Sequence, residues 1–267
     1  MVVDTILFGD CRETLKEFDG KARTCVTSPP YYGLRDYGGE ESQIGQEQTP
    51  EEYIQNLVEV FRSVRDVLTD DGTLWVNIGD SYYNYRPGKG QALPKQTVSK
   101  TKQDLPDKCA KRGNKLEGLK EKDLIGIPWM LAFALRADGW YLRQDIIWHK
   151  PNPMPESVKD RCTKSHEYIF LLSKNRKYYY NNEAIKEPVK QDWGTRDRTK
   201  GKYHNPGTGL VPHSGLSKSY DRKNKRDVWT VTNKPYKGAH FAVYPPDLIE
   251  PCIKAGSEEG DIVLDPF

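Results

Sequence analysis

The stretch VTSPPYYGLRDYG, residues 26–38, places a serine, two prolines and two tyrosines directly behind an apolar run. Proline has no backbone N–H to donate to a sheet, and it disfavours helical geometry at the residue before it. We therefore expect the chain to leave a strand at Ser28 as a stiff, extended loop. Such a loop can hold a hydroxyl, carbonyl oxygens and aromatic rings in fixed positions, as catalysis by placement requires.

Four other apolar runs also end in polar or reactive groups. In a doubly wound sheet, ligands bind outside the carboxyl ends of the strands. An aspartate after a strand commonly caps the next helix, but several such endings in one chain favour a shared cleft. These endings are Gly9-Asp10, Asp80-Ser81, Lys150-Pro151-Asn152 and Asp265-Pro266-Phe267.

Strand and helix patterns alternate along the chain, which predicts an α/β sheet with crossover helices. The clearest helix starts at Thr49 as N-cap with Pro50 in its first turn, and its apolar residues recur at helical spacing up to Leu68. The predicted strands are 5–9, 22–28, 72–80, 141–150, 166–174 and 261–267, with 176–182 as a further pairing segment. The other predicted helices are 11–18, 124–139 and 245–257.

The composition excludes several classes of protein. The 267 residues have a mean hydropathy of −0.80 and no apolar run near the roughly 18 residues of a membrane span. The N-terminus lacks the basic and small-residue features of a signal peptide. The five cysteines are scattered without CxxC spacing, which argues against a disulfide framework or a zinc site and favours a reducing cytosol.

Charge is unevenly distributed, although the net charge is only +3. Residues 84–122 carry eleven Lys and Arg against four Asp and Glu, and residues 186–237 carry thirteen against five. Both stretches are irregular in pattern, and the rest of the chain is acidic. An acidic body with two basic segments suggests that loops grip a polyanion, although solvated loops would have the same composition.

The ordered set of motifs resembles the β-class (permuted) amino-DNA methyltransferases of the SPPY type. The matching segments are FGDCRETL, TSPPYY, DGTLWVNIGDSYY, RQDIIWHKPNPMPESVKDRCTKSHEYIFLL and KRDVWTV through HFAVYPPDLIEPCIKAGSEEGDIVLDPF. The resemblance covers nearly all of 4–83, 123–183 and 225–267 and omits most of the two basic stretches.

This resemblance implies a fold and a domain organisation. The fold class is α/β: a Rossmann-like S-adenosylmethionine-dependent methyltransferase sheet with helices on both faces, circularly permuted motif order and two basic loop insertions. The catalytic domain would comprise 1–83, 123–185 and 238–267, interrupted by a basic insertion loop at 84–122 and a target-recognition region at 186–237. The family continues past its DPF motif with a Gly-rich turn, so we expect this sequence to be incomplete at Phe267.

The resemblance also implies the reaction, which is methyl transfer from S-adenosylmethionine to the exocyclic amine of a flipped base. The catalytic residues would be Ser28, Pro29, Pro30 and Tyr31, with Ser28 Oγ and the Pro29 carbonyl accepting from the amine and Tyr31 stacking on the base. The cofactor would be bound by Asp10, Thr27, His240, Phe241, Ala242, Asp265, Pro266 and Phe267. DNA would be bound by Tyr32, Lys150, Asn152, Arg196, Arg198, Arg222 and Arg226. No metal is expected.

Several alternatives stay open at this point. Lys150 could equally be a solvated charge, and His166 and Glu167 are interpreted as structural. Ser-initiated motifs usually accompany N4-cytosine methylation, and N6-adenine methylation is the alternative. Cytosine-C5 chemistry is disfavoured because Pro251-Cys252 falls in a helical pattern. A catalytically impaired DNA-binding module is the competing class, with RNA or protein methylation weaker still.

The expected partner is double-stranded DNA, with a cognate restriction endonuclease as a further candidate within a restriction-modification system. The family resemblance also predicts a cytoplasmic, nucleoid-associated protein of a prokaryote or phage that is monomeric or homodimeric, with no membrane partner. The sequence itself does not give the recognition site.

Overall fold

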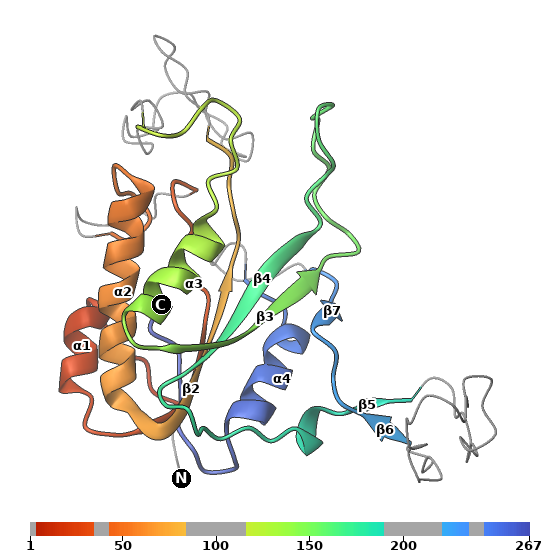
Figure 1. The fold of residues 1–267 in the computed structure, drawn as a ribbon. Helices are drawn as coiled ribbons and strands as arrows, with labels where there is room; N and C mark the ends of the chain where they lie inside the picture. The colour runs from red at the N-terminus through yellow and green to blue at the C-terminus, as the bar shows by residue number, and fades with distance from the viewer. Residues whose placement is uncertain (1–3, 35–42, 84–115, 190–220, 235–242) are drawn as a thin grey trace, which may run out of the picture. The chain divides into compact units, whose positions relative to one another are not determined.

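The computed structural model describes residues 4–34, 43–83, 116–189, 221–234 and 243–267. A six-stranded sheet in the order β7-β3-β4-β2-β1-β8 forms its centre (Figure 1). Its strands are β1 (Ala22–Thr27), β2 (Leu68–Ile78), β3 (Tyr141–His149), β4 (His166–Ser173), β7 (Val228–Thr230) and β8 (Val263–Leu264).

The sheet is mostly parallel, with one reversed strand. β1 pairs in parallel with both β2 and β8, and β3 pairs in parallel with β7. β4 runs antiparallel to both of its neighbours, β2 and β3. The amino end of β4 therefore lies at the same edge as the carboxyl ends of the other strands.

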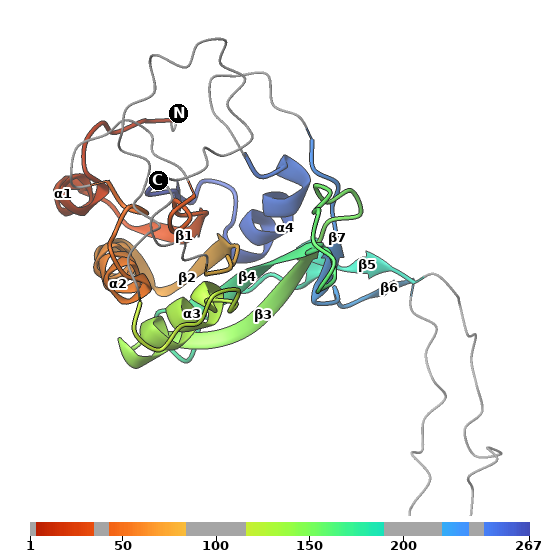
Figure 2. The same ribbon diagram turned by 90° about the horizontal axis from the view of Figure 1, so that it is seen from above.

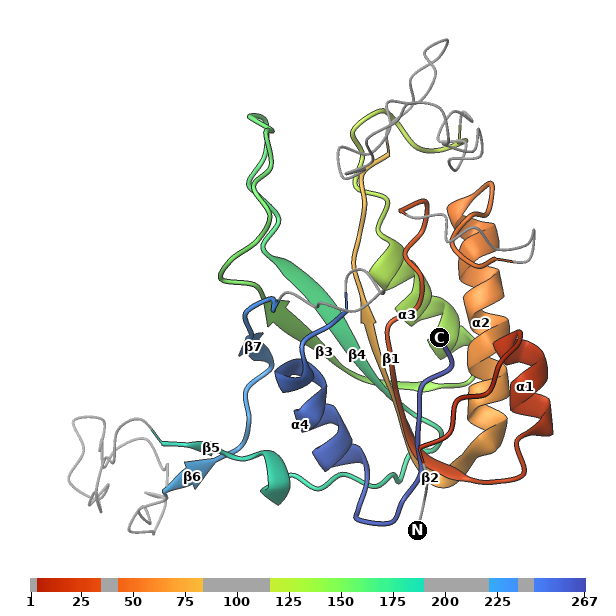
Figure 3. The ribbon, with the colours of Figure 1, turned by 180° about the vertical axis from the view of Figure 1, so that it is seen from behind.

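Helices cover both faces of this sheet, as the fold prediction requires. Figure 2, seen from above, shows α2 and α3 on one face and α4 on the other, with α1 beside α2. In Figure 3, which views the molecule from the side opposite to Figure 1, α4 lies between the viewer and the sheet. The helices are α1 (Cys11–Glu17), α2 (Pro50–Val67), α3 (Ile127–Ala137) and α4 (Pro246–Gly256).

The start of α2 follows the sequence signals closely. The Thr49 side chain accepts from the backbone N–H of Glu52, and the Glu52 carboxylate accepts from the backbone N–H of Thr49. This reciprocal capping box satisfies two N–H groups that the helix leaves free, and Pro50 needs no such partner. The predicted cap and first turn are therefore confirmed.

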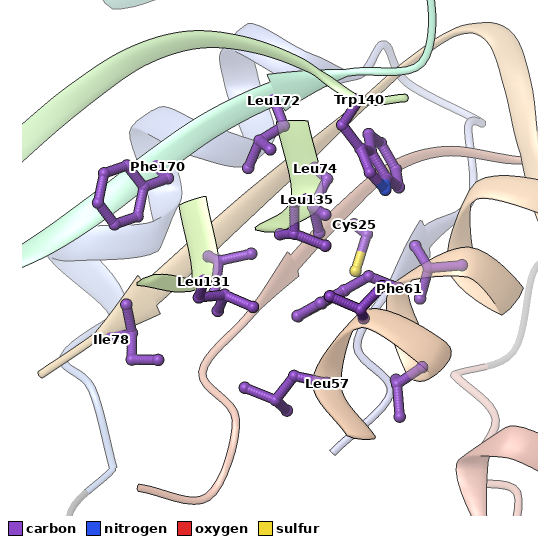
Figure 4. Packing of buried hydrophobic residues seen from close by; sticks show 14 of the residues in the cluster. Cys25, Leu57, Phe61, Leu74, Ile78, Leu131, Leu135, Trp140, Phe170 and Leu172 are labelled. Carbon is purple, nitrogen blue, oxygen red and sulfur yellow. The ribbon is translucent and has the colours of Figure 1, made fainter. Parts of the chain in front are cut away.

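The principal core lies between the sheet and the α2–α3 face. Tyr53, Phe61 and Leu135 from these helices are essentially inaccessible to solvent, as are Leu74 and Leu172 from the sheet. Close packing of this kind makes truncation of a core side chain cost about 2–5 kcal/mol. Figure 4 labels Cys25, Leu57, Phe61, Leu74, Ile78, Leu131, Leu135, Trp140, Phe170 and Leu172 in this cluster.

Three secondary-structure predictions were wrong, and a fourth was right only in part. Residues 5–9 pair with no strand in the described part of the chain, and Ile6 and Phe8 are exposed. Residues 176–182 do not extend β4. Residues 228–230, expected to be irregular, form β7 because they pair with the end of β3. Only Val263 and Leu264 of the predicted C-terminal strand pair with β1. An apolar segment forms a strand only where a neighbouring strand offers partners for its backbone hydrogen bonds.

The described residues divide into two compact units, 1–180 with 227–267 and 181–226. The smaller unit contains the short strands β5 (Glu187–Pro188) and β6 (Arg222–Lys223), which pair antiparallel, and the short 3-10 helix η1 (Glu183–Ile185). Among the helices that the structure describes, none is long and apolar enough to cross a membrane.

Candidate active site at the carboxyl edge of the sheet

One edge of the sheet gathers most of the predicted site residues that the structure describes. The parallel pairing places Ser28 after β1, Lys150 after β3 and Asp265 after β8 at this edge. Because β4 is antiparallel, its second residue, Glu167, lies there too. Asp80 follows β2, but its carboxylate accepts from the backbone N–H groups of Ser81, Gly126 and Ile127. Asp80 is thus occupied in fixing the start of α3.

The Ser28–Tyr31 loop is held from both sides. The buried Tyr53 of α2 donates its hydroxyl hydrogen to the Pro30 carbonyl oxygen at 2.7 Å. The Tyr31 ring lies so close to Gly79 that a Cβ added there would be 2.7 Å from Tyr31 Cε2. The loop therefore leaves β1 in a fixed direction, and a glycine after β2 makes room for its aromatic ring.

A polar network joins this loop to the neighbouring strands. The Tyr31 hydroxyl donates to Glu167 Oε2 at 2.8 Å, and Asn77 Nδ2 of β2 donates to the same oxygen at 3.2 Å. Lys150 Nζ forms an ion pair with Glu167 Oε1. The side chains of Lys150 and Glu167 are only 17% and 16% exposed. Two opposite charges withdrawn from water in this way depend on each other, so each side chain fixes its partner.

Tyr31 keeps its proton in this environment. Burial raises the pKa of its hydroxyl well above the usual range, and the nearby Glu167 carboxylate raises it further. A hydrogen bond with the Ser28 side chain opposes part of that rise in pKa. The Tyr31 hydroxyl therefore binds Glu167 and also has the Ser28 side chain in its surroundings.

A second polar cluster surrounds Asp265, after β8. Thr27 Oγ1 donates to Asp265 Oδ1 at 2.5 Å, and the Phe267 backbone N–H donates to the same oxygen at 3.2 Å. Tyr244 donates its hydroxyl hydrogen to Oδ2 at 2.9 Å. Asp265 as a whole residue is exposed, but protein atoms surround its carboxylate. The resulting desolvation raises the pKa of the carboxyl group, and the three hydrogen bonds oppose part of this rise.

The donors to Asp265 are all neutral, and no ion pair reaches its carboxylate among the residues that the structure describes. A desolvated anion bound only by neutral groups gains from a nearby cation. The cluster is therefore suited to a positively charged ligand. Pro266 stands beside it half-buried, and the Phe267 ring packs edge-on against Phe61 with 6.2 Å between centroids.

Asp10 is already engaged by a neighbour. It caps α1 by accepting from the Arg12 backbone N–H at 2.9 Å, and the Arg12 guanidinium binds both of its carboxylate oxygens. The hydrogen bond from the Arg12 side chain lowers the pKa of Asp10. A ligand amine at Asp10 would share the carboxylate with this guanidinium.

The predicted DNA-binding residues have local partners. The Tyr32 ring lies 5.5 Å from that of Tyr53, and Asn152 exchanges hydrogen bonds with the Asn233 backbone. In the smaller unit, Arg226 pairs with Glu187 and Arg222 donates to the Lys186 carbonyl. The predicted residues Arg196, Arg198, His240, Phe241 and Ala242 lie outside the described residues, as does 84–115 of the basic insertion.

Sequence reasoning missed Glu167 and Tyr244 as members of these clusters. Glu167 is the second residue of a strand, and an acidic side chain at this position does not by itself indicate a functional site. Its role becomes visible only from the antiparallel pairing of β3 with β4. In this pairing Glu167 lies opposite Trp148, two residues before Lys150.

In the described ranges, no group of His, Cys, Asp and Glu could hold a metal ion. Cys252 is buried in the helix α4, in agreement with the helical pattern predicted around Pro251-Cys252.

The family model described as DNA methylase, N6_N4_Mtase, matches residues 22–267. The chain belongs to this DNA methylase family. The predicted family and fold class are confirmed, and so is the predicted enzyme class, a DNA methyltransferase. The predicted methyl donor, S-adenosyl-L-methionine, is the one that this methylase family uses.

Curated relatives of this methylase cover most of its length. It is 48% identical to the Type II methyltransferase M.SmaI of Serratia marcescens, over 98% of this chain and 78% of that protein. It is also 48% identical to the Type II methyltransferase M.Cfr9I of Citrobacter freundii, over 98% of this chain and 76% of that protein.

Solved structures agree with the fold at low sequence identity. PvuII DNA methyltransferase, titled cytosine-N4-specific, matches with a TM-score of 0.56 and 15% identity, over 96% of this chain and 71% of that chain. A Thermus thermophilus protein complexed with S-adenosyl-L-methionine matches with a TM-score of 0.53 and 21% identity, over 97% and 76% of the two chains.

Proposed function

We propose that this methylase transfers a methyl group to the N4 amine of cytosine in double-stranded DNA. The observation that carries the choice of base is Ser28, a neutral hydroxyl at the position where β1 delivers the SPPY loop. Serine at this position resembles the N4-cytosine members of the family, whereas aspartate or asparagine resembles the N6-adenine members.

The proposed chemistry at Ser28 follows from the electronics of a base amine. Its lone pair is delocalised into the ring, so the nitrogen must become pyramidal before it can attack a methyl group. Acceptors placed around its two N–H groups favour that geometry, and we assign Ser28 Oγ and the Pro29 carbonyl to this role. The Pro30 carbonyl already accepts from Tyr53, which supports a loop that stays in place during the reaction.

S-adenosylmethionine would supply an electrophilic methyl group on a positively charged sulfur. The Asp265 cluster fits a ligand of this charge, because a desolvated carboxylate there is held only by neutral donors. We assign Thr27, Asp265, Pro266 and Phe267 to the side of the site that holds the methionine part of this cofactor. Asp10 is proposed to accept from its adenine amine, with Arg12 sharing the carboxylate.

The base must leave the DNA helix to reach Ser28. We propose that Tyr31 and Tyr32 line the pocket for the flipped cytosine, and that Lys150 and Asn152 stand at its rim. Residues 186–237 are proposed as the target-recognition region, with Arg222 and Arg226 reaching DNA after exchanging their present partners. The basic residues of 84–122 would bind phosphates without reading sequence.

The named relatives are Type II methyltransferases, which supports a place in a bacterial restriction-modification system. In that setting the protein would act in the cytoplasm on the host's own DNA, and a cognate endonuclease would cleave the same sequence when it is unmethylated.

Methyl transfer to mixed-sequence duplex DNA, followed by mass spectrometry of the nucleosides, tests this proposal. We expect N4-methylcytosine with the wild-type protein and a rate of its formation about 10²–10³-fold lower with Ser28→Ala. N6-methyladenine in place of N4-methylcytosine would overturn the assigned base. Absence of both modified bases, with S-adenosylmethionine shown to bind by calorimetry, would overturn DNA as the substrate.

A further inference from the structure

The partly buried ion pair between Lys150 and Glu167 has a feature that support of the fold alone does not require. Its carboxylate accepts a hydrogen bond from Tyr31 at 2.8 Å, and the side chain of Ser28, three residues before Tyr31 in the same loop, is near enough to lower the pKa of the Tyr31 hydroxyl. We propose that Glu167 is the terminal proton acceptor of a relay that runs from the base amine through Ser28 and Tyr31. The inference rests on the proposed function at Ser28 and extends it.

The strand pairing places Glu167 where a relay must end. In the antiparallel pairing of β3 with β4, Trp148 opposes Glu167 and His149 opposes His166. The Lys150 backbone N–H donates to the Ser165 carbonyl at 2.7 Å, which closes the pair of strands next to Glu167. Lys150 Nζ also lies 4.1 Å from the centroid of the Trp148 ring. The lysine side chain is thus held beside the carboxylate from two directions.

The proton balance of the step is simple. When the base nitrogen gains a methyl group, it gains a positive charge and must lose one proton. That proton passes from the nitrogen to Ser28 Oγ, the hydroxyl proton of Ser28 passes to the Tyr31 oxygen, and the phenol proton of Tyr31 passes to Glu167 Oε2. Ser28 and Tyr31 end unchanged, the methylated base is neutral, and Glu167 is a neutral carboxylic acid until it releases the proton to water.

The environment of Tyr31 suits a group that passes a proton on and remains protonated itself. Burial and Glu167 raise the pKa of its hydroxyl, so Tyr31 remains a donor to Glu167 at neutral pH. The 2.8 Å separation between the Tyr31 and Glu167 oxygens is within the range for proton transfer along a hydrogen bond.

Other titratable groups face Glu167 and must be considered in a pH experiment. They are Lys150 at the end of β3, Lys164 before β4 and His166 on β4. Burial lowers the pKa of Lys164 and also that of His166, where Lys164 lowers it further. A pH profile therefore needs a variant that changes Glu167 alone.

The substitution Glu167→Gln provides this test. Glutamine keeps the shape and an acceptor oxygen for Tyr31 but cannot take up the proton. We expect kcat for methyl transfer to fall about 100-fold, as loss of a general base typically causes. The dissociation constants for S-adenosylmethionine and for DNA should change less than about threefold. The dependence of kcat on pH should also change in this variant, because the group that takes up the proton has been removed.

Tyr31→Phe interrupts the same relay one step earlier. Because the two residues would act as one unit, the double variant should lose no more activity than the poorer single variant. Losses that multiply in the double variant would overturn the relay, as would a wild-type kcat in Glu167→Gln. Glu250→Gln is the matched control, since Glu250 forms an exposed ion pair with Lys254 on α4.

A measurement on the protein alone separates this proposal from the proposed function. With tyrosine labelled by carbon-13 at the ring carbon that bears the hydroxyl, NMR follows the ionisation of Tyr31. Glu167→Gln should shift the titration of Tyr31 to lower pH, because removal of the negative charge makes tyrosinate less costly. An unchanged Tyr31 titration would overturn the link between these residues even if methylation is normal. A shifted titration without any methylation would locate the failure in the proposed function.

Discussion

The two carboxylates at the carboxyl edge of the sheet, Glu167 and Asp265, have opposite electrostatic surroundings. Glu167 faces the Lys150 ammonium and accepts two further hydrogen bonds from Tyr31 and Asn77. Asp265 accepts from Thr27, Tyr244 and a backbone N–H, all of them neutral. The first cluster is balanced in charge within the protein itself. The second gains from a cation, which a sulfonium cofactor would bring.

This difference separates the part of the site that would bind the base from the part that would bind the methyl donor. The balanced cluster adjoins Ser28 and would serve the base, while the unbalanced cluster would serve the methyl donor. Variants should therefore divide into those that change the rate of transfer and those that change affinity for the cofactor. Four measurements test that division.

The largest effect is expected for Ser28→Ala. Loss of the hydroxyl removes an acceptor that stabilises the transition state, and a single such group is worth about 10²–10³-fold in kcat. Affinity for S-adenosylmethionine, measured by calorimetry, should stay within about threefold of wild type, because Ser28 lies outside the Asp265 cluster. Equal losses in rate and cofactor affinity would contradict the division between the two clusters.

Asp265→Asn should show the converse behaviour. The variant keeps the shape but loses the negative charge, so S-adenosylmethionine should bind about 10–100-fold more weakly, as expected for a charged hydrogen bond. The rate at saturating cofactor should fall much less. Asp66→Asn, an exposed position at the end of α2, is the control that should leave cofactor affinity unchanged. Unaltered affinity in Asp265→Asn would exclude Asp265 from the cofactor site.

Gly79→Ala is expected to disturb the Glu167 cluster alone. A Cβ at this position would meet Tyr31 Cε2 at 2.7 Å, so the ring must shift away from its place. Overpacking of this kind costs about 1–3 kcal/mol in unfolding free energy. Chemical denaturation should report that loss, and kcat should fall while cofactor affinity is retained. Wild-type stability and turnover would show that the Tyr31 loop has room to adjust.

The smallest effect expected is a pH dependence of stability caused by Asp265. The folded-state pKa of Asp265 is raised above its ordinary value of 3.8. The stabilisation that this shift provides is therefore present in full below pH 3.8 and is lost as the pH rises through the folded value. Relative to the wild type, Asp265→Asn should become more stable as the pH is raised from about 4 to 8. A constant difference between the two unfolding free energies over this range would contradict the raised pKa.

The fold could be predicted from sequence where local signals and tertiary packing agree. Thr49, Pro50 and the apolar stripe behind them specify α2 almost to the residue. Residues 5–9 failed because an apolar run does not reveal whether a strand will lie beside it. Residues 228–230 failed for the opposite reason, since three polar-flanked residues pair with β3 only after the sheet is assembled.

The candidate site was predictable in part for a similar reason. Ser28 and Asp265 lie in recognisable motifs at strand ends, and the parallel strands bring them to one edge. Glu167 was interpreted as structural, because its partners Tyr31 and Lys150 come from segments 136 and 17 residues away. A single sequence does not reveal contacts that depend on strand register.

The bond between the Lys150 N–H and the Ser165 carbonyl has a consequence for how such a methylase can change. It seals the base of the long connection between β3 and β4, which rises beyond the sheet in Figures 1 and 3. Residues 151–164 lie outside that seal, whereas Lys150 and Glu167 lie at its base. A change in the length of this connection therefore need not alter the strand register that sets the Lys150–Glu167 ion pair.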